Sequence, residues 1–214
     1  MTRLRSIWMT STRFTKADFA QALAELSRLD GDLATVLEQH GPPPMWSRKP
    51  GFSTLVHIIL EQQVSLASAK AAFDRLLAAV DKLTPESFLD LNDTELLRIG
   101  FSRQKARYCR GLAAEIIAGR LRLDVLGRKE QERAREDLLS IIGIGPWTAD
   151  IYLLMALMKP DIWPVGDLAL AEAMREIKGL DARPGAEEQL AIAEQWRPWR
   201  AVAARIHWHH YLSS

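Results

Sequence analysis

A short glycine-rich interruption lies inside an apolar helical pattern near residue 145. The stretch SIIGIGPWTADIYLLM, residues 140–155, places Gly143 and Gly145 two positions apart, and Pro146 follows at once. Glycine permits close approach of a ligand to the backbone, and proline suits the first turn of a helix, so the pattern predicts helix, tight hairpin, helix. The N–H groups from Gly145 to Thr148 could then bind an anion, and we favour a DNA phosphate. A tight turn between two helices, without a ligand, is the alternative.

An aspartate follows the second hairpin helix, after a Trp-Pro-Val-Gly turn. Asp167 opens the segment DLALAEAMREIKG, so its simplest role is that of a helix N-cap. A carboxylate beside a hairpin that holds DNA could also stabilise positive charge on a sugar and position or deprotonate water, as carboxylates do at oxocarbenium-like transition states. The residues alone leave both roles open.

The segments that carry these residues have helical spacing throughout. Alternating runs rich in Val, Ile and Thr are missing, so we expect an all-α protein of about ten helices joined by short loops. The proline-rich segment 41–50 is the linker candidate. We expect one unit over 1–214, built as two helical lobes that flank a cleft. One lobe would comprise about residues 1–45 and 145–214, and the other about residues 50–140.

Composition limits the classes of function. The chain has 28 Lys and Arg against 27 Asp and Glu, so binding of nucleic acid requires a local basic surface. No apolar run is long enough to span a bilayer, and the start MTRLRSIWMTST lacks the features of a signal peptide. We therefore expect a cytoplasmic protein, nucleoid-associated if bacterial, with no membrane partner. A single cysteine, Cys109, excludes an internal disulfide and a four-cysteine iron–sulfur cluster.

The order of the motifs resembles the helix-hairpin-helix, Gly-Pro-Asp (HhH-GPD) superfamily of DNA base-excision glycosylases. The resemblance covers about residues 15–212, and within the superfamily the sequence is most similar to the 3-methyladenine DNA glycosylase II type. It rests on LLSIIGIGPWTADIYLLMAL with IWPVGDLAL, on GFSTLVHIILEQQVSLASAKAAFDRL, on LLRIGFSRQKARYCRGLAAEI and on WRPWRAVAARIHWH. It implies a monomer that binds double-stranded DNA containing damaged bases, flips out alkylated purines of the 3-methyladenine or 7-methylguanine type, and excises them by hydrolysis in base excision repair.

The resemblance assigns roles to particular residues. Asp167 falls on the catalytic aspartate of the family. Trp147 and Trp208 fall on positions that line the base pocket, where indole rings attract an electron-poor or cationic base, although Trp208 could also be a core tryptophan. Trp147 occupies the slot of the lysine nucleophile of endonuclease III-like relatives, so we expect a monofunctional enzyme. A pocket tyrosine of some relatives is replaced by Ile151, which leaves the range of lesions open.

The remaining roles concern contact with DNA. Gln63, with Gln62 adjacent, falls on the wedge that fills the space left by a flipped base, and a polar helix end is the alternative. The resemblance also implies backbone contacts and a monovalent cation, with no cofactor required. The DNA-backbone residues would be Gly143, Gly145 and Thr148, and the carbonyls for Na⁺ or K⁺ would be those of Leu139, Ile141 and Ile144. Two other functions stay open: a bifunctional oxidised-base glycosylase/lyase and a non-catalytic relative that binds DNA structures.

Overall fold

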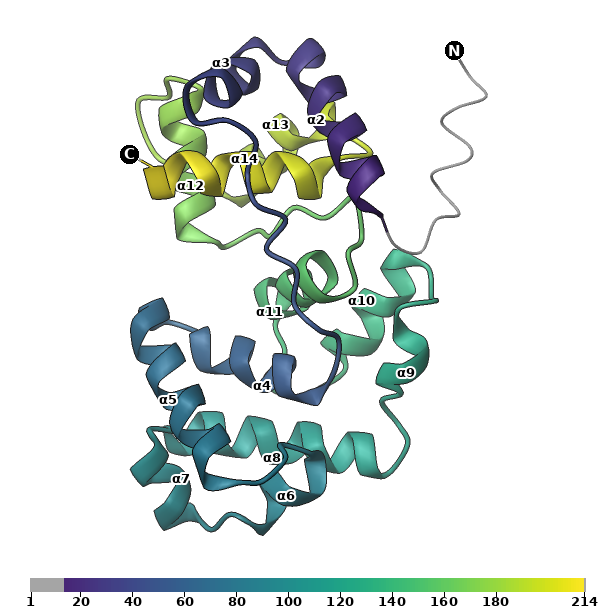
Figure 1. The fold of residues 1–214 in the computed structure, drawn as a ribbon, viewed down its shortest axis with the longest axis vertical. Coiled ribbons are helices and arrows are strands. Elements are labelled where there is room, and N and C mark those ends of the chain that lie inside the picture. The colour runs from purple at the N-terminus through teal and green to yellow at the C-terminus, as the bar shows by residue number, and fades with distance from the viewer. Residues whose placement is uncertain (1–13, 214) are drawn as a thin grey trace. The chain divides into compact units, whose positions relative to one another are not determined.

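The computed structural model describes residues 14–213, and every regular element in that range is a helix (Figure 1). The prediction of an all-α fold is confirmed. These residues form thirteen α-helices, a π-helix and a 3₁₀ turn, which is more than the expected ten, because one-turn elements such as α9 (Leu123–Leu126) carry little periodicity. None of the described helices is long and apolar enough to cross a membrane. Residues 1–13, to which the expectation of no signal peptide applies, lie outside the described range.

Contacts along the chain divide it into two compact units. The split unit comprises residues 1–47 and 153–214, and the central unit comprises residues 48–152. The first division falls within the predicted linker, residues 41–50. The second falls at Tyr152, so the glycine hairpin and α11 belong to the central unit, whereas the expected lobe boundary lay at residue 145.

The central unit is organised around α8, which packs against α4, α6 and α7. Local signals set the ends of its helices: α7 begins after Asn92, whose side chain accepts the Glu95 N–H (3.0 Å), and ends at Gly100, where φ is +111°. The sequence NDTELLRIG predicts a start at Asn92 or Asp93 and a stop at Gly100, and the structure selects Asn92 as the cap. The helices of this unit are α4 (Phe52–Glu61), α5 (Leu66–Ala79), α6 (Pro85–Asp90), α7 (Asp93–Ile99), α8 (Arg103–Ile117), α9, α10 (Gln131–Leu139) and α11 (Pro146–Ile151).

The split unit is built around its last helix, α14, which packs against α2, α3 and α12 and is buried from residue 200 to 208. The apolar pattern WTADIYLLMALM, residues 147–158, predicts one helix, but α11 is followed instead by a π-helix over Tyr152–Ala156, and Met158 has a φ of +55°. The other elements are α2 (Lys16–Leu29), α3 (Gly31–His40), α12 (Leu168–Ile177), α13 (Ala186–Ala193), a 3₁₀ turn (Glu194–Trp196) and α14 (Arg200–Ser213).

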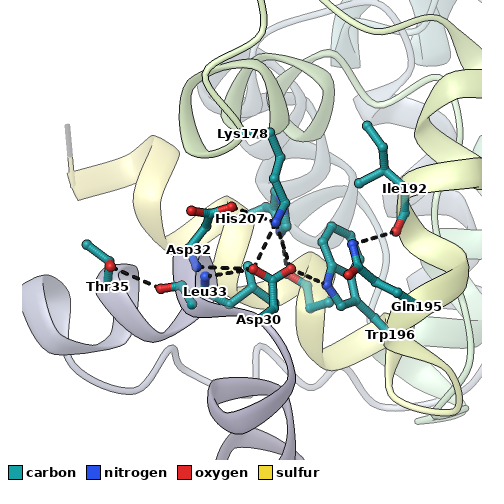
Figure 2. Close-up of polar contacts among 11 residues, drawn as sticks. Asp30, Asp32, Leu33, Thr35, Lys178, Ile192, Gln195, Trp196 and His207 are labelled. Atoms are coloured by element: carbon teal, nitrogen blue, oxygen red, sulfur yellow. Dashed lines mark hydrogen bonds and ion pairs between the residues drawn. The ribbon is translucent and has the colours of Figure 1, made fainter.

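A buried polar cluster joins α3 to the C-terminal part of the split unit (Figure 2). Asp30 caps α3, and its carboxylate accepts hydrogen bonds from Lys178 Nζ (2.7 and 2.8 Å) and from Trp196 Nε1 (2.7 Å). The ring of Trp196 lies against His207, with 4.9 Å between centroids. We call these four residues the Asp30 cluster. Trp196 is fully buried, so its indole serves packing within the split unit.

Candidate functional site

The predicted hairpin connects α10 to α11, and its two glycines are required for different reasons. Gly143 has a φ of +93°, and a Cβ on it would lie 2.2 Å from Cγ of Tyr108 on α8, so the fold itself demands glycine. Gly145 has an ordinary φ of −86°, and nothing lies within 4 Å of a Cβ placed there. Neither the backbone conformation nor the packing requires glycine at 145. The absence of a side chain there instead leaves the backbone at the start of α11 uncovered.

A glutamine from the end of α4 holds the hairpin in place. Gln62 Nε2 donates to the Gly143 carbonyl (3.0 Å) and to Thr148 Oγ1 (2.9 Å). Thr148 is buried and its hydroxyl is bonded to Gln62, so its contact with DNA remains a prediction. The Gln62 amide is also committed to the hairpin. Of the two wedge candidates, Gln63 is therefore the one whose side chain is exposed in the turn.

The turn that presents Gln63 is strained and is held from one side by a lysine. Gln63 has a φ of +55°, a backbone conformation that side chains other than glycine adopt at a cost. Lys105 Nζ donates to the carbonyls of Leu60 (2.7 Å) and Gln62 (2.8 Å) at the end of α4. Burial lowers the pKa of Lys105. The sequence gives no signal for this role, because a lysine in the first turn of an amphipathic helix is typical of an ordinary surface residue.

The carbonyls predicted to hold a monovalent cation lie between α10 and the hairpin. Leu139 is the last residue of α10, and the Ile141 carbonyl accepts the Ile144 N–H at 3.0 Å. A carbonyl oxygen has two lone pairs, so this bond leaves the Ile141 oxygen able to accept another partner. Three neutral carbonyls form a donor set that suits a hard, singly charged cation, and the cation remains a prediction.

Asp167 is the N-cap of α12, as one of its two predicted roles requires. Its Oδ1 accepts the Leu170 N–H at 2.9 Å, and the helix N-terminus favours negative charge at this position. The same oxygen accepts a hydrogen bond from Trp208 Nε1 on α14 at 3.2 Å. Asp167 is half-buried and Trp208 is 8% exposed. Two residues that the family resemblance singled out are thus in direct contact within the split unit.

The aromatic candidates are distributed over both units. Trp147 is half-buried in the first turn of α11 in the central unit, and Trp208 lies in the split unit. The structure adds Trp46, which packs against Trp208 with 6.5 Å between ring centroids and 79° between ring planes. In the sequence, Trp46 lies within the proline-rich segment 41–50 and carries no assigned role. A large aromatic residue in a loop between two helices was the signal that could have identified it.

Comparisons with known proteins bear on the same residues. Residues 56–198, which include the hairpin and Asp167, match the HhH-GPD superfamily base excision DNA repair protein. DNA-3-methyladenine glycosylase 1 of Schizosaccharomyces pombe is 28% identical over 205 residues, which cover 92% of this chain and 87% of that protein. A DNA-3-methyladenine glycosylase of Bacillus subtilis is 27% identical over 169 residues, which cover 73% of this chain and 56% of that one.

Solved structures give the same result for the fold. The S. pombe 3-methyladenine DNA glycosylase (Mag1), solved in complex with abasic DNA, aligns with a TM-score of 0.81 and 26% identity, covering 88% of this chain and 95% of that one. The chain spans 56% of the length of this B. subtilis relative and 64% of the length of a second one, YfjP. The match over residues 56–198 places this chain in the HhH-GPD superfamily of base excision DNA repair proteins.

Proposed function

We propose that this protein is a monofunctional DNA glycosylase that flips alkylated purines, of the 3-methyladenine or 7-methylguanine type, out of double-stranded DNA and hydrolyses their N-glycosidic bond. The observation that carries the proposal is the half-buried Asp167 carboxylate, which is held by the α12 N-terminus and by the indole of Trp208. It occurs in a chain whose family repairs DNA by base excision. The names of its S. pombe and B. subtilis relatives support 3-methyladenine as the substrate class.

The chemistry requires little more than a fixed negative charge. An alkylated purine of this type carries positive charge and leaves readily, and positive charge develops on the deoxyribose as the bond to C1′ breaks. Asp167, oriented by the Leu170 N–H and Trp208 Nε1, stabilises that charge and orients or deprotonates the water that attacks C1′. The water oxygen forms the new bond to C1′, and the base departs with the electrons of the broken bond.

The hairpin residue Trp147 supports hydrolysis without strand cleavage. A lyase needs an amine that attacks the sugar and forms a Schiff base. The chain reads Gly-Pro-Trp-Thr-Ala at residues 145–149, where the endonuclease III-like pattern has its lysine. An indole cannot form that bond, but it can stack on a flipped, electron-poor base.

The DNA contacts follow from the hairpin and the α4–α5 turn. The backbone at Gly143, Gly145 and Thr148 would contact phosphates, and Gln63 would fill the gap in the base stack. A Na⁺ or K⁺ ion at the carbonyls of Leu139, Ile141 and Ile144 would add positive charge facing a phosphate. No step of the hydrolysis passes through this ion.

Single-turnover release of 3-methyladenine and 7-methylguanine from methylated duplex DNA tests the proposal. Wild type should release both bases, and Asp167→Asn should slow release about 100-fold or more, because the stabilising negative charge is lost. Asn caps helices as well as Asp does, so the free energy of unfolding should change by only a few tenths of a kcal/mol, roughly. Asp18→Asn, at an exposed helix start in the same unit, is the matched control and should leave the rate unchanged.

The other two functions give different results in the same assays. Borohydride should trap no covalent adduct between wild type and DNA, and a trapped adduct would instead indicate a lyase. Wild type that binds lesion-bearing DNA but releases no base would indicate a non-catalytic binder, in which Asp167 is only a helix cap.

A further inference from the structure

The loop between α3 and α4 brings a second tryptophan of the split unit, Trp46, against Trp208, which is bonded to Asp167. The Trp46 ring lies against Trp208 with the two planes at 79°, and against His209 with 6.3 Å between ring centroids. The two indoles therefore pack edge to face, and Nε1 of Trp208 is bonded to Asp167. Trp46 is half-buried, so part of its surface remains open to a ligand.

The backbone of Trp46 is strained. Its φ is +41°, in the left-handed region that bulky residues rarely enter. Such residues cost free energy, persist only where their surroundings enforce them, and occur most often at functional sites. A glycine would relieve the strain at this position, yet the chain carries its largest side chain there.

A buried arginine enforces this conformation. Arg205 of α14 has no exposed surface, and its Nε donates to the carbonyl of Met45, the residue before Trp46, at 2.7 Å. Its other nitrogens donate to the carbonyls of Ala201 (2.8 Å) and Leu154 (3.0 Å). Since Arg205 and Trp208 lie one turn apart on α14, the loop and Trp208 are fixed to the same helix. Trp46 is thus held at a defined position beside Trp208.

We propose that Trp46 is a specificity-determining residue that contacts the flipped base, an inference that rests on the proposed glycosylase function. Asp167 acts at C1′, so the base attached to that carbon lies within reach of Trp208, which is bonded to Asp167, and of Trp46, which packs on Trp208. An indole face is electron-rich and attracts a cationic ring. Trp46 would therefore favour positively charged alkylated purines over normal, uncharged ones.

The packing tryptophans of the same unit provide the contrast. Trp199 is 3% exposed, and its Nε1 donates to Glu25 Oε2 at 2.6 Å. Trp199 is not among the described residues that have a positive φ. Trp46 differs in both respects, because part of its surface is exposed and its backbone is strained.

The test compares Trp46→Leu and Trp46→Phe with wild type and with Trp199→Phe as the matched control. Two quantities are measured: single-turnover release of 7-methylguanine, and affinity for a duplex that contains an abasic-site analogue, which has no base to contact. Trp46→Leu should slow release about tenfold and leave the affinity for abasic DNA unchanged. Trp46→Phe should recover most of the rate, because it restores an aromatic face. Trp199→Phe should lower the melting temperature and leave both quantities unchanged.

Each other outcome overturns the inference. Wild-type rates in Trp46→Leu, together with loss of release in Asp167→Asn, would reject the role of Trp46 and keep the glycosylase. A parallel fall in release, abasic-site affinity and melting temperature would mean that Trp46 only supports the fold. A Trp46→Phe variant as slow as Trp46→Leu would reject contact through an aromatic face. Wild type without any release would reject the glycosylase and the role of Trp46 together.

Discussion

Two aspartates of the split unit share one structural motif and differ in their surroundings. Asp30 and Asp167 are both helix N-caps, and each accepts an indole N–H, from Trp196 at 2.7 Å and from Trp208 at 3.2 Å. Asp30 is 5% exposed and also binds Lys178, whereas Asp167 is half-buried. The comparison shows that cap geometry is common to both aspartates and that exposure is what separates them.

The charge of Asp30 is used within the fold. Burial alone would raise the pKa of Asp30, but hydrogen bonds from Lys178 and Trp196 outweigh burial, and the net pKa is lowered. The carboxylate is therefore ionised and its charge is balanced by a neighbouring ammonium group. A substrate cannot use a charge that is already neutralised in the interior, so we expect the Asp30 cluster to contribute stability, and the proposed chemistry rests on Asp167.

The largest effect that we expect from this contrast is the acid sensitivity of the Asp30 cluster. Burial lowers the pKa of His207 to about 4, from an ordinary value of 6.5. Between pH 6.5 and 4, His207 is protonated in the unfolded chain but not in the folded chain. The contribution of His207 to the free energy of unfolding is therefore fully present above pH 6.5 and is lost as the pH drops towards 4. At about 1.4 kcal/mol per pH unit, the loss amounts to about 3 kcal/mol. Urea unfolding of wild type at a series of pH values measures it.

His207→Phe isolates this contribution. The variant keeps a ring of similar size and removes Nε2, which has no hydrogen-bond partner among the described residues. It should flatten the fall in stability between pH 6.5 and 4, while His40→Gln, at a less buried histidine of the same unit, should not. An equally steep fall in His207→Phe would mean that another group controls acid sensitivity.

The next largest effect is the exchange of roles between the two carboxylates. Asp30→Asn retains the helix cap but leaves Lys178, which is mostly buried, with only Asp32 at 2.8 Å. We expect the free energy of unfolding to fall by about 2 kcal/mol, because one partner of a buried ion pair is lost. The excision rate of the folded protein should not change. Asp167→Asn should show the reverse, with a large loss of rate at nearly constant stability.

Chemical unfolding and single-turnover release, measured on both variants, check this exchange. An Asp30→Asn protein with wild-type stability but a reduced rate of base release would contradict the distinction between the two aspartates. So would an Asp167→Asn protein that is fully active but unstable.

The smallest effect concerns the two indoles. Trp196→Phe removes a donor from a buried carboxylate, so it should cost about 1 kcal/mol more stability than Trp208→Phe, whose bond is longer and less buried. Trp208→Phe should slow base release several-fold, and Trp196→Phe should not. Equal losses of stability, with no difference in rate, would show that Trp208 is a second packing tryptophan. Thermal unfolding and base release on the two variants make the measurement.

Local sequence signals predicted the helices, the hairpin and the Asp167 cap, because these depend on residues three or four apart. Contacts between distant segments were not predictable in this way. Gln62 reaches Gly143 across 81 positions, and Lys178 reaches Asp30 across 148. Neither pair leaves a periodic signal in the chain. Trp46 was missed for the same reason, since its meaning depends on Trp208, which lies on a helix at the other end of the chain.

The two hairpin glycines have a consequence for how descendants of this protein can diverge. Any side chain at 143 collides with Tyr108, so every functional or non-functional descendant that keeps the fold and that tyrosine must retain this glycine. Residue 145 faces no such barrier from its own protein. A lineage that abandoned DNA would be free to replace it with alanine or serine. Loss of glycine at 145 with retention at 143 would therefore indicate a descendant that keeps the fold but no longer binds DNA through the hairpin.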